Sequence, residues 1–195
     1  MATMILLPDG SNTVSFHWIP VGGIPATHEA ALADDNGSTS YSKCDDDNAS
    51  MIIEFANPSV AEGDIASIDS IRFLSSGKSV HRSNPSLVDI AFQTPPGFSE
   101  SCSYDAHRTN FETINGTART ATPIGGSWTY ANLENMEMKC TKDGTVEVYL
   151  SYLALEVTYT EAVAGYGNNV LGVASANIGK INGIATANIE KVNGV

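Results

Sequence analysis

Long apolar runs and a surplus of basic residues are both missing from this sequence of 195 residues. No stretch approaches the roughly 20 apolar residues of a membrane-spanning helix. The first residues carry no basic segment and their apolar run ends at Pro8, so we expect no signal peptide. Ten Lys and Arg face 22 Asp and Glu, a formal net charge of -12. Because nucleic acids and anionic membranes attract clustered Lys and Arg, we expect neither as a partner.

Cysteine is scarce and unpatterned. Cys44, Cys102 and Cys140 are odd in number, far apart, and contain no CxxC pair. This pattern predicts reduced, partly buried thiols and argues against a zinc site or a disulfide framework. Reduced thiols fit a protein that is made and folded in a cytoplasm.

Catalytic motifs are absent as well. The four histidines have no HxxxH or HExxH spacing, and there is no GxSxG elbow. We therefore expect histidines on the surface or on strand faces without ligands. Residues 75–79 lack the full frame of a phosphate-binding loop, so we expect a hairpin turn there. The sequence predicts a protein that is not an enzyme, with no catalytic residue and no cofactor. The four histidines for which we expect no ligand are His17, His28, His81 and His107.

Acidic side chains do cluster in two short segments, residues 34–36 and 45–48. Clustered oxygen ligands suit Ca²⁺, but the EF-hand frame is missing, so we expect solvated acidic turns and no metal site. Carboxylate pairs are numerous enough for a glycosidase by residue type alone. The aromatic platform of a sugar-cleaving cleft is poorly supplied, because Trp18 and Trp128 are the only tryptophans.

What the chain does contain is a series of strand-like runs. Hydrophobic residues make up 42% of it, and short β-branched and aromatic runs alternate with Gly, Pro, Asn and Asp. This predicts an all-β domain over residues 1–161, an antiparallel β-sandwich of jelly-roll type. The expected strands are residues 4–7, 13–18, 40–44, 51–55, 67–74, 87–92, 101–104, 112–117 and 145–159.

The clearest of these strands changes phase halfway. Apolar residues occupy even positions from 146 to 152 and odd positions from 153 to 159. A slip of one residue indicates either a β-bulge or a strand that crosses from one sheet to the other. The best helix candidate is a single turn at residues 129–134.

Residues 162–195 form a linker followed by a repeat of eleven residues. Residues 172–182 are echoed by residues 183–193, and a third copy begins at Gly194. Eleven residues equal three helical turns, so one interpretation is an amphipathic helix. The other is short extended segments joined by Asn-Gly turns. We favour the extended segments, because a glycine inside a helix costs about 1 kcal/mol.

On either interpretation, the tail has too few repeats to bury its own Ile and Val side chains. We therefore expect it to pack on other copies or on a partner, as an assembly element. The predicted assembly interface comprises Ile178, Ile181, Ile184, Ile189, Val192 and Val195.

Several segments resemble structural proteins of tailed bacteriophages. Residues 118–134 and 154–159 resemble a module of such proteins, and residues 17–18 and 33–41 look like its opening. The repeat segments at residues 180–184 and 191–195 are similar to motifs near the ends of phage fibre, tail and head-decoration proteins.

The resemblance implies a jelly-roll-like domain on a virion that is assembled in the cytoplasm of a host bacterium. The expected function is a capsid decoration (cement) protein. It would associate with itself, as a trimer or an array, and with the major capsid protein or other virion proteins. The alternatives are a tail or fibre subunit and a particle-borne carbohydrate-binding module. Exposed Trp or Tyr side chains that form a flat platform would favour carbohydrate binding, whereas burial of these side chains between the two sheets would favour the structural role.

Overall fold

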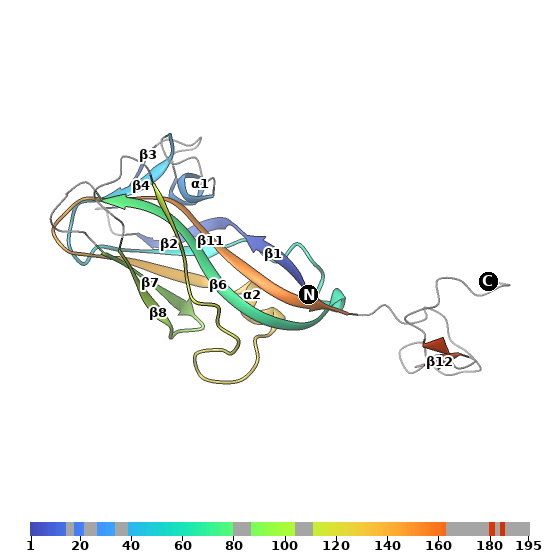
Figure 1. The fold of residues 1–195 in the computed structure, drawn as a ribbon. Helices are drawn as coiled ribbons and strands as arrows, with labels where there is room; N and C mark the ends of the chain where they lie inside the picture. The colour runs from blue at the N-terminus through green and yellow to red at the C-terminus, as the bar shows by residue number, and fades with distance from the viewer. Residues whose placement is uncertain are drawn as a thin grey trace.

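Two antiparallel β-sheets stack face to face in the computed structural model of the chain (Figure 1). The structure describes residues 1–14, 18–21, 27–33, 39–79, 87–103, 111–162, 180–181 and 184–185. The predicted all-β sandwich is confirmed. Within these described ranges, no helix is long and apolar enough to cross a membrane.

The first sheet is built around two long strands, β6 and β11, which run side by side along the molecule (Figure 1). On its other side, β11 pairs with β4 through Val148–Leu150 and with β1 through Leu155–Tyr159. The strands of this sheet are β1 (Ala2–Leu6), β3 (Trp18–Val21), β4 (Tyr41–Cys44), β6 (Ile65–Ser79), β9 (Glu112–Asn115) and β11 (Val148–Glu161).

The second sheet has five strands in the order β2, β5, β10, β7, β8. Its strands are β2 (Pro8–Val14), β5 (Ser50–Phe55), β7 (Leu87–Thr94), β8 (Ser99–Ser103) and β10 (Glu137–Asp143). Alternate residues of β5, β7 and β10 are buried, as expected for strands with one face on a core.

Three short helical segments join the strands: α1 (His28–Leu32), η1 (Glu62–Asp64) and α2 (Tyr130–Glu134). The expected turn at residues 129–134 is confirmed as α2. Thr129 caps this helix, and its side chain and that of Asn132 bond each other's backbone N–H groups. The first helix was not expected, although Thr27 caps it by accepting from the Ala30 N–H.

The phase change in the last long strand is a β-bulge. The pairing of β11 with β6 shifts between Leu150 and Tyr152, so Ser151 is the extra residue. Leu150 and Leu153 then both face the core, and both are fully buried. The strand stays in the first sheet, so the alternative of a crossing strand is wrong.

The structure corrects two further expectations. Ser75–Ser79 is not a hairpin turn, because these residues belong to β6 and have strand partners in β11 and β9. Strand β10 was missed, because its inward residues Met138, Cys140 and Lys142 are not the β-branched and aromatic types that mark strands.

Candidate functional site

The repeat of the tail is described at two short strands, β12 (Lys180–Ile181) and β13 (Ile184–Ala185). They pair antiparallel, with Ile181 opposite Ile184. This pairing agrees with the extended interpretation of the repeat. Ile178, Ile189, Val192 and Val195 lie outside the described residues, so the assembly interface stays a prediction.

The described core of the sandwich is built by residues 1–161, which we call the body. Its cluster of buried side chains extends from Met4 to Tyr159 among the described residues. Strand β11 ends at Glu161, and the Ala162 N–H donates to the Asp64 carbonyl at 2.8 Å. The burial of residues 163–195 lies outside what the structure describes, so the role of the tail stays a prediction.

Both tryptophans belong to that core. Trp18 and Trp128 are 2% and 4% exposed. The Trp18 indole N–H donates to the Ala49 carbonyl at 3.0 Å, and that of Trp128 donates to the Arg119 carbonyl at 2.8 Å. They form no exposed platform, which is the burial pattern expected for a structural role.

A group of aromatic side chains nevertheless lies on the solvent side of the first sheet. Tyr41 and Tyr149 meet edge to face with ring centroids 5.0 Å apart, and Phe111 lies 6.2 Å from Tyr41. The Lys78 ammonium lies 4.6 Å from the Phe111 centroid and 5.2 Å from that of Tyr149. We call these four residues the outer aromatic cluster. All four are partly exposed.

Charged side chains flank this cluster. The Lys43 ammonium and the Glu147 carboxylate lie 3.9 Å apart. A hydrogen bond to the Glu147 carboxylate is the largest of the effects that raise the pKa of Tyr149 to about 12, so this phenol stays protonated near neutral pH. The outer aromatic cluster thus combines apolar ring surface with polar donors and an acceptor.

A polar pocket of about 340 Å³ lies where β2, β5 and β10 approach the end of α2. Its walls include Asp9, Glu54, Glu134 and Glu137. Glu54 and Glu137 are direct cross-strand partners, and the Thr94 hydroxyl donates to Glu137 at 2.7 Å. The four carboxylates give the pocket a negative potential. The like charges of Glu54 and Glu137, which lie directly opposite each other, destabilise the sheet slightly.

The acidic turn at residues 45–48 supports a neighbouring turn. The Asp47 carboxylate accepts from the N–H groups of Asn48 and Gly144, at 3.0 and 2.9 Å. Behind it, the fully buried Lys142 side chain donates to the Gly144 carbonyl. Asp47 is thus occupied by backbone amides. Asp34 and Asp35 lie outside the described residues. In the described part of the chain, no three His, Cys, Asp or Glu side chains are arranged to hold a metal.

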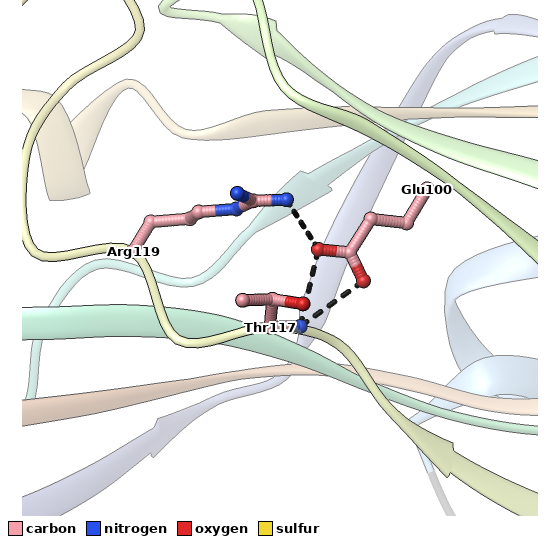
Figure 2. Close-up of polar contacts among 3 residues, drawn as sticks. All are labelled: Glu100, Thr117 and Arg119. Atoms are coloured by element: carbon pink, nitrogen blue, oxygen red, sulfur yellow. Dashed lines mark hydrogen bonds and ion pairs between the residues drawn. The ribbon is translucent and has the colours of Figure 1, made fainter.

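Figure 2 shows an interaction that ties the edges of the two sheets together. The Glu100 carboxylate, on β8, accepts from the Thr117 N–H at 3.0 and 3.1 Å and from the Arg119 guanidinium at 2.5 Å. The Arg119 guanidinium also lies 4.6 Å from the centroid of the Phe98 ring. Because Thr117 and Arg119 follow β9 of the first sheet, these contacts close one side of the sandwich. We call Glu100, Thr117 and Arg119 the edge clip.

His28 and the three thiols are interior groups. His28 is buried on α1, with its Nδ1 2.6 Å from the Ser42 hydroxyl, so the expectation of a surface or strand-face position is wrong for this residue. Burial lowers its pKa from 6.5. The expected free, buried thiols are confirmed, and burial raises the pKa of Cys44 and of Cys140. Protonated thiols are weak nucleophiles. His17, His81 and His107 lie outside the described residues.

No protein-family model matches the chain, and no curated protein matches it. Solved structures with a similar fold include the C-terminal CBM6 of the laminarinase LamC from Zobellia galactanivorans. It has 5% identity and a TM-score of 0.45, and the match covers 80% of this chain and 100% of that one.

Two further similar structures are parts of larger proteins. A family two carbohydrate esterase from Cellvibrio japonicus has 12% identity and a TM-score of 0.35, over 82% of this chain and 34% of the esterase. Dimeric latent PorU from Porphyromonas gingivalis has 13% identity and a TM-score of 0.39, over 91% of this chain and 16% of PorU. These similarities assign no activity to the chain.

Proposed function

We propose that this chain is a non-catalytic structural component of a phage particle, with residues 1–161 as a rigid body and residues 162–195 as its attachment. The observation that carries the proposal is that residues 1–161 supply both sheets of the sandwich and the described hydrophobic core between them. We infer that the Ile and Val side chains of the tail repeat make contacts with other molecules, because so few repeats cannot bury these side chains by themselves. The resemblance of the repeat to the ends of phage structural proteins supports the particle as the place of those contacts.

Within the particle, the proposed role is that of a capsid decoration (cement) protein. A compact sandwich with an apolar extension suits a subunit that sits on a lattice and extends a segment to its neighbours. The partners would be other copies, as a trimer or an array, and the major capsid protein.

Localisation on purified particles tests this proposal. Antibodies against residues 1–161, used in immunogold electron microscopy of virions, should label the head at regular high occupancy. Labelling confined to the tail would support a tail or fibre subunit instead. A particle preparation in which mass spectrometry finds no copy of the chain would contradict the whole proposal.

A second candidate function is a particle-borne carbohydrate-binding module. The outer aromatic cluster favours it, because partly exposed rings beside hydrogen-bonding groups are typical of sites that bind amphipathic ligands. The two functions are compatible, since a decoration protein has an outward surface that is free to bind a ligand.

A further inference from the structure

The outer aromatic cluster brings side chains from four separate segments to one place. Tyr41 lies on β4, Tyr149 on β11 and Lys78 on β6, and Phe111 precedes β9. Lys43, Tyr149 and Lys78 are consecutive cross-strand partners, so they form one row across the outer face of the sheet. Core packing does not require rings on this face, because the buried residues of the same strands point to the other side.

The charge of the cluster points to the kind of ligand. Lys43 has Glu147 as an ion-pair partner, whereas no ion pair joins Lys78 to a carboxylate within the described ranges. The contacts that hold the Lys78 ammonium are the ring faces of Phe111 and Tyr149. A cation–π contact fixes an ammonium without neutralising it, so Lys78 keeps the ability to bind an anionic group.

The polar neighbours of the rings favour a sugar over a purely apolar ligand. A pyranose has an apolar C–H face that packs on an aromatic ring and a rim of hydroxyls that need hydrogen-bond partners. Glu147 supplies an acceptor and Lys43 a donor beside the ring of Tyr149.

We propose that the outer aromatic cluster binds a carboxylated pyranose of an acidic polysaccharide. The sugar ring packs against Tyr41 and Tyr149, its carboxylate meets the Lys78 ammonium, and its hydroxyls bond Lys43 and Glu147. The net charge of -12 does not prevent this contact. At physiological salt the screening length is about 8 Å, so the ligand carboxylate is governed mainly by the lysines beside it.

Titration of the full-length protein with two oligosaccharides of equal length tests the proposal. Tetragalacturonate has a carboxylate on every ring, whereas maltotetraose is neutral. We expect calorimetric binding of tetragalacturonate with a Kd below about 1 mM, and maltotetraose weaker by about tenfold or more. Absence of tetragalacturonate binding at about 10 mM would overturn the proposal, as would equal affinity for both sugars.

A matched pair of lysine variants locates the site. Lys78→Gln removes the ammonium and should weaken tetragalacturonate binding by about tenfold or more. Lys139→Gln removes the same charge from β10, where Lys139 lies on the outer face of the second sheet, and should leave the affinity unchanged. Equal losses in the two variants would mean that general charge, and not the cluster, attracts the sugar, which would contradict the proposal.

Variants of Tyr149 separate ring packing from charge. Tyr149→Leu should abolish binding of the acidic sugar, whereas Tyr149→Phe keeps the ring and should retain most of it. Thermal melting of each variant checks that the sandwich remains folded. If Tyr149→Leu melts normally and binds like the unaltered protein, the assignment of the site is wrong. None of these results depends on localisation to a particle, so a failure here is distinct from a failure of the structural role.

Discussion

The body, residues 1–161, and the tail, residues 162–195, differ in the pattern of their apolar side chains. In residues 1–161, Ile, Leu and Val alternate along strands and are buried between two sheets. In residues 162–195, Ile and Val recur in an eleven-residue repeat, and the described part of it forms strands of two residues each. Two paired strands are marginally stable alone in water. From this difference we propose that folding depends on the body and that association depends on the tail.

The largest expected effect is the difference in folding between a chain truncated within the body and a chain truncated after residue 161. A chain that ends before β11 loses the strand that pairs with β1, β4 and β6. We expect complete loss of the cooperative melting transition and of the β-type circular dichroism. A chain of residues 1–161 should keep both. If the chain that ends before β11 still folds, the distinction between body and tail is wrong.

A single core substitution should have the next largest effect. Leu153 is fully buried on β11, directly after the bulge. Leu153→Ala should reduce the free energy of unfolding by about 2–5 kcal/mol, measured by urea denaturation. The same substitution should cost as much in residues 1–161 as in the full-length chain. A much smaller cost in the truncated chain would mean that the tail contributes to the core.

The edge clip predicts a smaller loss. Glu100→Gln keeps the shape of the side chain but removes the charge that faces Arg119 and the Thr117 N–H. Because the Glu100 and Arg119 side chains are 25% and 28% exposed, we expect a loss of about 1 kcal/mol. Glu62→Gln, at an exposed position of η1, is the charge-matched control and should change the stability little. Equal effects in the two variants would show that the edge clip contributes nothing specific.

The smallest predicted effect is a pH dependence. The pKa of His28 is lowered in the folded protein by burial, so the unfolded chain binds a proton more readily below pH 6.5. Stability should therefore fall as the pH drops through 6.5, and His28→Gln should reduce that fall. Urea midpoints of both proteins between pH 7.5 and 5.5 give the measurement. Identical pH profiles would contradict this account of His28.

The sandwich could be predicted from the sequence because most strands have clear alternation and turn residues. The bulge at Ser151 was visible as a change of phase, since a slip of one residue moves apolar positions to the other face. Strand β10 was not visible, because Met, Cys and Lys carry little strand preference until neighbouring strands bury them.

The candidate sugar site was beyond sequence reasoning for a different reason. Its members come from positions 41, 78, 111 and 149, and cross-strand pairing brings them together. No local motif marks such a set. The tail presents the opposite case, because its repeat is obvious in the sequence, whereas its proposed assembly role depends on contacts with other molecules.

Particle incorporation tests the central claim most directly. Full-length chain, residues 1–161, and the double variant Ile181→Asp with Ile184→Asp are each produced during particle assembly, and copies per purified particle are counted by mass spectrometry. The account predicts normal occupancy for the full-length chain, and strongly reduced occupancy for the other two even though both are folded. Normal occupancy of residues 1–161 would contradict the claim that the tail is the assembly element.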